Sequence, residues 1–368
     1  MVGDTHFGVF PLNLNKWVKI QFDYFYKQLI PYLKKHVKEG DILIHGGDLF
    51  DNRTSVPIIV QNKVEQLLID IGEILPVHII VGNHDLWNKG DNSINSPKIY
   101  NWLPNVNVYE KTTIIEKCDK KLVLMPWVEK KPDMIKEIDN NPGDYLFCHS
   151  DLNGCLMHLS SVAHRNKDKI DVEEFGRYKR VFSGHIHIRQ VHKNFEFIGA
   201  PYQMDRNDYN DKKGLTILNL ETGETEFVEN NVSPTFKKIK ISSDGDLLLL
   251  EHLNTDNHFV DLEINNSVLV GKRKNRKVLE KLLTQKNFAK IDYIDDLSKK
   301  KKEDEKGLTN VEVSLDDLKL DDFSEVIIKY TKSQEYQNET MKNGVLDEMD
   351  KIIKIYNKEH KFKKDDDR

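Results

Sequence analysis

The chain has 368 residues, of which 38% are hydrophobic and 31% charged, and its formal net charge is −5 at pH 7. This length predicts two or three parts, and the apolar content excludes disorder throughout. The mild acidity argues against a wholly basic nucleic-acid coat protein, but it is compatible with local basic patches. Three cysteines cannot form a disulfide framework, and no apolar run approaches the roughly 20 residues that cross a bilayer. We therefore expect a soluble, intracellular protein.

Short β-rich apolar runs alternate with helical segments up to about residue 235. Four runs are typical of buried strands: Asp41–Gly47, Pro76–Asn83, Asp144–Ser150 and Arg180–His187. Helical periodicity covers Lys16–Lys38 and Pro57–Ile74, and further strands are predicted at Phe195–Ala200, Leu215–Leu220 and Glu224–Glu229. Strands and helices in this order predict a layered α/β sandwich with mixed sheets.

The pattern changes after Pro234, and it predicts four parts in all. Residues 1–235 form the sandwich, and residues 236–297 resemble a small α+β unit with two strands, a basic helix and a third strand. Residues 298–312 begin with a charged run and read as a solvated linker. Residues 313–368 look helical, and one helix carries an apolar stripe at helical spacing: Met341, Val345, Met349, Ile352, Ile353 and Tyr356.

Five polar clusters lie at the ends of the strand candidates or just beyond them. In open α/β sheets, ligands bind outside the carboxyl ends of the strands, so these clusters should converge. Their carboxylate, amide and imidazole groups suit first-row divalent ions better than calcium. The seven candidate ligands exceed one tetrahedral site and would serve two metals if one carboxylate bridges: Asp4, His6, Asp48, Asn83, His149, His185 and His187.

Each cluster taken alone has a structural explanation. Gly-Asp is usually a turn, and a lone histidine such as His149 is more often a hydrogen-bonded core residue than a ligand. His185 and His187 alternate on a predicted strand and would face the same side, which favours metal binding. The five clusters together, in this order, disfavour the structural explanation. The other nine of the 14 histidines, His45 among them, have no such setting and are expected to be ordinary.

The clusters Asp-x-His, Gly-Asp-x-x-Asp, Gly-Asn-His-Asp, His and Gly-His-x-His resemble the signature of calcineurin-like metallophosphoesterases. The chain is more similar still to the SbcD-like DNA repair nuclease subunits, and above all to their T-even phage branch. This narrower resemblance rests on Gly47–Arg53, Val81–Leu86, His149–Gly154, Phe182–His187, Ile198–Pro201 and the C-terminal linker with two helices. It implies a four-layer α/β (α+β) sandwich with a small capping domain and C-terminal helices.

The resemblance also implies site roles. Asp4, His6 and His187 would bind the first metal, Asn83, His149 and His185 the second, and Asp48 both. His84 would contact the scissile phosphate and protonate the leaving oxygen, with Asp85 nearby to orient it. The reaction would be direct in-line attack by metal-bound hydroxide, with two divalent ions as cofactors. Manganese is the expected metal, and magnesium is the alternative.

Two departures from the family pattern matter. The family has a full strand before the first cluster, whereas only Met1 and Val2 precede Gly3. We therefore expect Asp4 and His6 to be poorly anchored, with reduced occupancy of the first metal. Asp51 stands where many cellular relatives carry histidine, and both a structural and a catalytic role remain open for it.

DNA contact requires cationic surface near the metals. The candidates are Arg53, the loop 88–98 and a basic helix with Lys272, Arg273, Lys274, Arg276 and Lys277. For the basic helix, a solvated face is an equal alternative. The apolar stripe of the tail resembles the segment that holds an SbcC-like coiled-coil ATPase. Packing of this helix against its own domain is the alternative. The resemblance further implies a homodimer without membrane contact.

These features lead to one main hypothesis and two alternatives. The main hypothesis is a two-metal-dependent DNA exonuclease and endonuclease, the nuclease subunit of an SbcCD-like repair and recombination complex. It would work in the cytoplasm, or in the host cytoplasm if a phage encodes it. One alternative is a related phosphatase or phosphodiesterase that acts on a substrate other than DNA. The other is a catalytically impaired scaffold subunit, which the missing first strand would favour.

Overall fold

The computed structural model describes residues 1–10, 13–158, 161–162, 166–253, 255, 258–286 and 288–294. This part of the chain belongs to one compact unit, Met1–Asp296. The predicted linker, the predicted helical tail and the apolar stripe from Met341 to Tyr356 lie outside the described residues. No helix within the described ranges is long and apolar enough to cross a membrane. All three cysteines are free thiols.

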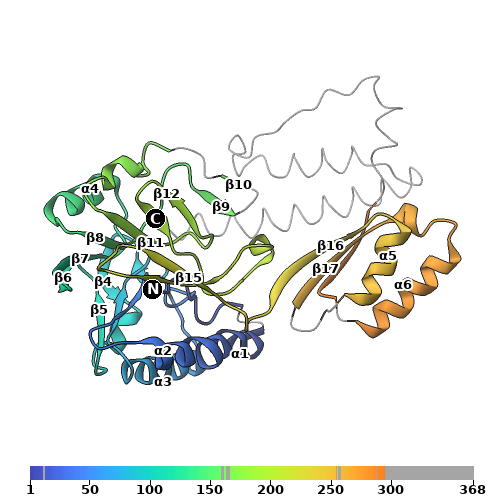
Figure 1. The fold of residues 1–368 in the computed structure, drawn as a ribbon, viewed down its shortest axis with the longest axis horizontal. Coiled ribbons are helices and arrows are strands. Elements are labelled where there is room, and N and C mark those ends of the chain that lie inside the picture. Colours follow the sequence, from blue (N-terminus) through green and yellow to red (C-terminus); the bar gives the residue numbers. More distant parts are fainter. Residues whose placement is uncertain are drawn as a thin grey trace, which may run out of the picture. The chain divides into compact units, whose positions relative to one another are not determined.

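Two sheets form the centre of the fold (Figure 1). The smaller sheet is parallel and consists of β1 (Leu43–His45), β2 (Val77–Ile80) and β5 (Val106–Tyr109), in that order. The larger sheet has the order β12–β13–β11–β8–β7–β6, and its strands are β6 (Thr113–Lys117), β7 (Lys120–Met125), β8 (Tyr145–His149), β11 (Arg180–Gly184), β12 (Gln190–His192) and β13 (Phe195–Phe197). Its four central strands are parallel, whereas β6 and β12 pair antiparallel at the edges.

Alternation along the central strands assigns side chains to three core layers. On β8, Leu146 packs in the core outside the larger sheet, while Phe147 packs between the two sheets. On β1, Leu43 packs under the helices and Ile44 between the sheets. The core between the sheets comprises Ile44, Ile80, Leu122, Leu124, Tyr145, Phe147, Phe182 and Ile198. Because both faces of these strands are buried, their sequences are nearly continuous apolar runs.

Helices cover the outer faces of both sheets. Those on the smaller sheet are α1 (Leu14–Tyr24), the π-helical turn η2 (Phe25–Leu29), α2 (Ile30–His36) and α3 (Ile58–Gly72). The larger sheet is covered by α4 (Lys131–Asn140) and the 3₁₀ turn η4 (Val172–Phe175). Figure 1 shows α2 and α3 on one side of the sandwich and α4 on the opposite side. The order helix, sheet, sheet, helix confirms the predicted four-layer fold class.

Smaller elements complete the described chain. Two of the predicted strands form a hairpin, in which β14 (Gly214–Leu218) and β15 (Thr225–Glu229) pair antiparallel. Two further hairpins consist of β3 (Leu86–Asn88) with β4 (Asp91–Asn95) and β9 (Leu156–His158) with β10 (Ser161–Val162). Single 3₁₀ turns are η3 (Pro97–Tyr100), η5 (Arg206–Asp208) and η6 (Asn266–Val268).

A separate parallel sheet follows the sandwich. It consists of β16 (Thr235–Ile241), β17 (His258–Asn265) and β18 (Lys290–Ile294), and it packs with α5 (Asp244–His252) and α6 (Arg273–Gln285). These helices and strands share their own apolar cluster, which includes Ile241, Leu262 and Leu282. The boundaries predicted for a capping domain, 236–297, stay a prediction.

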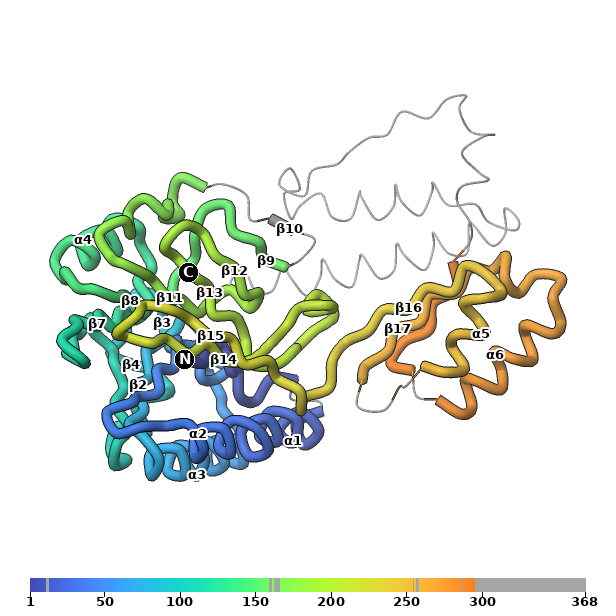
Figure 2. Tube along the Cα trace, in the orientation of Figure 1, coloured from blue at the N-terminus to red at the C-terminus, as the bar shows by residue number. Residues whose placement is uncertain are grey.

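The N-terminal segment corrects the expectation of poor anchoring. Val2 pairs with His45 as a parallel β-bridge, and the N–H groups of Asp4 and His6 donate to the carbonyls of Gly47 and Asp48. Figure 2 shows this end of the chain entering the sandwich beside β14, where the Met1 carbonyl accepts the Thr216 N–H. Asp4 is fully buried and His6 is 3% exposed. The expectation is wrong because backbone hydrogen bonds hold Asp4 and His6 against the β1 region.

Candidate active site

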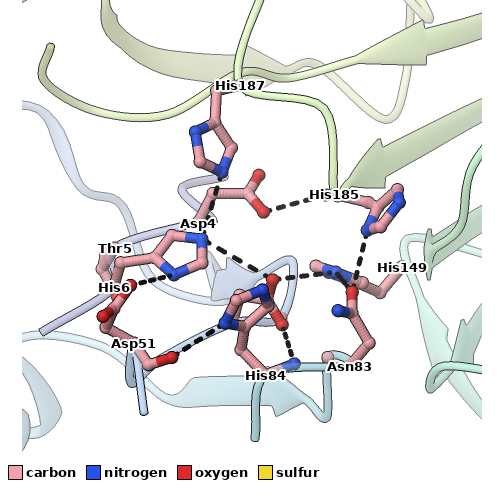
Figure 3. Close-up of polar contacts among 12 residues, drawn as sticks. Asp4, Thr5, His6, Asp51, Asn83, His84, His149, His185 and His187 are labelled. Atoms are coloured by element: carbon pink, nitrogen blue, oxygen red, sulfur yellow. Dashed lines mark hydrogen bonds and ion pairs between the residues drawn. The ribbon is translucent and has the colours of Figure 1, made fainter. Parts of the chain in front are cut away.

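The ends of four parallel strands bring most of the predicted ligands together. Asp48 follows β1, Asn83 follows β2, His149 ends β8, and His185 follows β11. The N-terminal segment contributes two more predicted ligands to the same place. In Figure 3 the labelled aspartate, asparagine and histidine side chains point toward one another. The predicted convergence of the clusters at strand ends is therefore present in the structure.

Asp4, His6 and His187 form what we call the first ligand group, and their potential ligand atoms all lie within 4.8 Å of one another. Nε2 of His6 is 3.1 Å from Nε2 of His187. Oδ1 of Asp4 accepts the backbone N–H of His185, whereas the buried Oδ2 has no hydrogen-bond partner. An unpartnered buried carboxylate oxygen beside two facing imidazole nitrogens is costly, and a cation would satisfy all three atoms. The residues present fit a metal ion.

Asn83, His149 and His185 form the second ligand group. Oδ1 of Asn83 lies 3.0 Å from Nε2 of His149 and 2.8 Å from Nδ1 of His185. Oδ2 of Asp48 lies 3.3 Å from Nε2 of His149 and 3.6 Å from Nε2 of His6. Asp48 therefore stands between the two groups, where a bridging carboxylate would be required. The ligand roles themselves stay a prediction.

Burial and charge set the protonation of these side chains. Burial opposes the charged form of His149, but the adjacent Asp48 carboxylate raises the pKa of His149 to about 9. The same contact holds the pKa of Asp48 well below its usual range despite its burial. Burial first, and then the charge of His149, lowers the pKa of His185 to about 3. Burial also lowers the pKa of His187, so two imidazoles are neutral, as metal ligands must be.

Left-handed backbone occurs at four of the seven predicted ligands: Asp4 (φ 50°), His6 (φ 42°), Asp48 (φ 54°) and His185 (φ 84°). Such a conformation costs about 1–3 kcal/mol for a residue other than glycine, although aspartate and histidine adopt it more readily than most. The surrounding structure must offset this cost.

Glycines in two of the clusters allow the close packing. A Cβ atom on Gly82 would lie 2.2 Å from Oδ1 of Asp48. On Gly47, whose φ is 98°, a Cβ would lie 2.3 Å from Nδ1 of His149. These distances are far below contact separations, so the glycines of Gly-Asp and Gly-Asn-His-Asp are steric requirements of the site.

His84 lies beside the first ligand group without belonging to it. Its ring lies edge-on against that of His6 at 4.8 Å between centroids, and its backbone N–H donates to Oδ1 of Asp48 at 2.8 Å. Nδ1 of the ring meets the carbonyl oxygen of Asp51 at 2.8 Å (Figure 3). Because that nitrogen must donate to a carbonyl, Nε2 remains available to a substrate.

Asp85 makes contacts different from those predicted for it. Its two carboxylate oxygens accept the backbone N–H groups of Phe50 and Gly82, so it joins the two loops that follow β1 and β2. Burial, reinforced by the charge of Asp48, raises the pKa of Asp85 to about 7. The His84 ring contacts the Asp51 carbonyl, and the orienting role expected of Asp85 stays a prediction.

The Asp51 side chain contacts the first ligand group. Its Oδ1 lies 3.3 Å from Nδ1 of His6, an ion-pair distance without hydrogen-bond geometry. Burial alone would lower the pKa of His6, but the carboxylates of Asp51, Asp48 and Asp4 together raise it. Asp51, His6 and His84 also offer ligand atoms within 4.8 Å of one another, so the structural and the catalytic role of Asp51 both stay open.

The loop after β11 corrects a second expectation. His185 and His187 do not alternate on a strand, because β11 ends at Gly184 and His185 is left-handed. They reach the site from a loop, and each points to a different ligand group. The carbonyl of His187 accepts Nζ of Lys213 at 2.7 Å and the N–H of Ala200. Lys213 is 5% exposed and pairs with two aspartates, so this loop is held by a buried cation.

Sequence reasoning missed several residues that support the ligands. His45, expected to be ordinary, has Nε2 3.0 Å from Oγ1 of Thr5 and lies beneath the Asp-x-His segment. The ring of Trp127 lies 5.1 Å from that of His185. Gln21 is buried on α1 beneath the same segment, and its position within an apolar helical face was a signal that could have identified it. Nothing in the sequence around Trp127 marks it.

Apart from the loop 88–98, which contains β4, the predicted DNA contacts lie in two places. Nε of Arg53 donates to the carbonyl of Asn83 at 3.0 Å, which places Arg53 at the site. The remaining residues are exposed at the N-terminal end of α6, the helix that packs on the separate sheet: Lys272, Arg273, Lys274, Arg276 and Lys277. Lys272 pairs with Asp244, and Arg276 donates to the Leu269 carbonyl, so part of this basic surface serves local structure.

The fold and the paired ligand groups define a metal-dependent phosphoester hydrolase. The sequence profile of the family "Calcineurin-like phosphoesterase" matches residues 1–189, and the chain belongs to this family. Family membership implies divalent metal binding and makes the chain a metal-dependent phosphodiesterase.

Three viral proteins are similar to the chain. It is 31% identical over 239 residues to "Exonuclease subunit 1" of Enterobacteria phage T4, an alignment that covers 63% of this chain and 67% of that protein. "Putative phosphoesterase 244L" of Invertebrate iridescent virus 6 is 26% identical over 228 residues, 59% of this chain and 74% of that protein. "Putative phosphoesterase 078R" of Invertebrate iridescent virus 3 is 23% identical over 305 residues, 78% and 82% respectively.

Proposed function

We propose that the chain is the nuclease subunit of an SbcCD-like DNA repair or recombination complex. It hydrolyses phosphodiester bonds of DNA as an exonuclease and endonuclease that depends on two divalent ions. The observation that carries this proposal is the pair of ligand groups with the Asp48 carboxylate between them. The name of the phage T4 relative, an exonuclease subunit, supports DNA as the substrate and a complex of several subunits.

Each ligand group would hold one ion, and Asp48 would serve both. The mixture of imidazole and oxygen ligands suits manganese, with magnesium as the alternative. A pair of such ions supplies polarisation of the phosphate and activation of water as a nucleophile near neutral pH. The unpartnered Oδ2 of Asp4 and the neutral imidazoles of His185 and His187 support this assignment.

His84 is the proposed proton donor. With Nδ1 fixed on the Asp51 carbonyl, a protonated ring presents its Nε2–H to the leaving oxygen of the substrate. The hydrogen bond from the backbone N–H of His84 to Asp48 couples the position of this residue to the carboxylate between the ligand groups. Asp85 holds the loop that carries His84 against the Asp48 loop.

The remaining parts of the proposal concern DNA and partners. Arg53, beside Asn83, would contact the phosphate backbone near the reacting bond, and the basic start of α6 would contact it farther along. Residues 236–297 would then act as a capping domain. Residues 313–368 would bind an SbcC-like coiled-coil ATPase through the apolar stripe, and the subunit would form a homodimer. We place this complex in the cytoplasm.

Linear duplex DNA and a chromogenic phosphodiester, each assayed with manganese, separate this function from the alternatives. We expect DNA cleavage, and we expect His84→Ala to lower it by about 10²–10⁴-fold while manganese binding persists. His36→Ala is the control, because His36 is an exposed histidine stacked on Tyr32. Hydrolysis of the small ester without DNA cleavage would reject DNA as the substrate. Turnover of neither compound would favour the scaffold.

A further inference from the structure

Gln21 is a buried amide in a helix face that is otherwise apolar. The face of α1 that packs into the core carries Trp17, Val18 and Phe22, and Gln21 lies among them with 0% exposure. A buried amide must find hydrogen-bond partners, since an unsatisfied one costs more than an apolar side chain at the same position. The hydrogen-bond partners of Gln21 therefore indicate its structural role.

All partners of Gln21 belong to the segment of the first ligand group or to Tyr202. Its Nε2 faces three acceptors, the carbonyls of Thr5 and His6, both at 3.0 Å, and the Tyr202 hydroxyl at 3.1 Å. Because the amide has two hydrogens, two of these acceptors share one. Its Oε1 accepts the N–H of Gly8 at 3.4 Å. Tyr202 in turn donates to the Thr5 carbonyl. We call Gln21 and Tyr202 together the amide clamp.

The amide clamp bonds the carbonyl groups of this segment that do not face the sheet. The N–H groups of Asp4 and His6 bond toward β1, but the carbonyls of Thr5 and His6 face α1 and are bonded by the clamp. Asp4 and His6 are both left-handed, a conformation that persists only when neighbouring groups enforce it. The clamp thus bonds the backbone at His6, a member of the first ligand group, and at Thr5, which lies between His6 and Asp4.

We propose that Gln21 is a positioning residue for the metal of the first ligand group and has no such role for the second. It acts through the backbone of Thr5 and His6, which sets where the Asp4 carboxylate and the His6 imidazole point. Residues that orient metal ligands typically change affinity by 10–100-fold when removed. This inference rests on the proposed two-metal site, and metal binding can test it without any nuclease assay.

Gln21→Leu tests the clamp in the full chain, with manganese titrated calorimetrically. We expect one of two manganese ions to bind about 10–100-fold more weakly and the other to be unchanged. Tyr202→Phe removes a single hydroxyl from the clamp and should weaken the same ion by less, which keeps the test usable if Gln21→Leu folds poorly. Added to His187→Gln, the Gln21→Leu change should have little further effect, because both act on one ion.

Gln28→Leu is the matched control. Gln28 also bridges two backbone groups, donating to the Glu229 carbonyl and accepting the Asn231 N–H, but these lie outside both ligand groups. Its variant should bind both ions normally. If the Gln21→Leu protein melts at a lower temperature but binds both ions with unchanged affinity, the proposed positioning role is wrong. Equal weakening of both ions would also contradict it.

Failure of the proposed function gives a different result. If the unchanged chain binds a single ion, the two-metal function is wrong. The clamp is then judged on that ion: weakening by Gln21→Leu but not by Gln28→Leu supports it, and no weakening overturns it.

Discussion

The two ligand groups sit side by side but are held by different means. In the second group, strand pairing sets the geometry: His149 pairs with Gly184 across β8 and β11, and His185 follows directly. In the first group, Asp4 and His6 come from a segment joined to the sheet by isolated bridges, and His187 comes from a loop. Buried side chains secure this group, namely Gln21, Tyr202 and Lys213. Where strand pairing does not set the position of a ligand residue, side-chain hydrogen bonds to its backbone must set that position.

Asp48→Asn should have the largest effect on metal binding, because Asp48 contacts a histidine of each ligand group. The variant keeps the shape of the side chain but removes the charge that faces His149 and His6. We expect calorimetry to show weakened binding of both manganese ions. Phosphodiester hydrolysis should fall by more than the ~100-fold that follows from loss of a merely orienting contact. Retention of one ion at full affinity would assign Asp48 to a single group.

His149→Gln and His187→Gln should separate the two groups. Each variant removes one imidazole from one group, so each should lose one manganese ion and retain the other. Together, the two substitutions should abolish both. The measurement is the number of ions bound per chain, with His36→Ala as the control at an exposed histidine. Loss of both ions in either single variant would show that the two groups form one cooperative site. It would contradict the view that they are held independently.

The sequence predicted the strand-held group better than the clamped one. Strands β1, β2, β8 and β11 were predictable because burial on both faces makes their sequences apolar throughout. The glycines and acidic or histidine residues at their ends form recognisable clusters because close packing demands those types. The seven candidate ligands could therefore be identified from the sequence, whereas their division into two groups came from the family resemblance.

The supporting contacts could not be derived in the same way. Gln21 donates to the backbone carbonyls of Thr5 and His6. Every residue has a backbone carbonyl, so the residue types at these two positions do not indicate which helix packs against them. The alternation expected for His185 and His187 failed because a left-handed residue ended β11 early. Helix α5 was not predicted since its core, Leu247–Leu250, is a continuous leucine run without helical spacing.

The acid sensitivity that His78 contributes should be the smallest effect, and His78 lies on the strand-held side of the comparison. His78 on β2 is 8% exposed, with Nδ1 2.7 Å from the Tyr109 hydroxyl, and burial, followed by the charge of Lys117, lowers its pKa to about 4. The ordinary value is about 6.5, so below that pH the unfolded chain binds a proton that the folded chain refuses. Stability from His78 is therefore complete above pH 6.5 and is lost as the pH falls toward 4.

The clamp has no comparable dependence, because an amide does not titrate and burial raises the pKa of Tyr202 well above its ordinary value. Denaturant unfolding at pH 7 and pH 5 measures the difference. His78→Gln should lose ~2 kcal/mol less free energy of unfolding between these pH values than the unchanged chain. Gln21→Leu should show the same pH dependence as the unchanged chain. An equal loss in His78→Gln would mean that other groups cause the acid sensitivity, and the contrast between titrating strand and non-titrating clamp would fail.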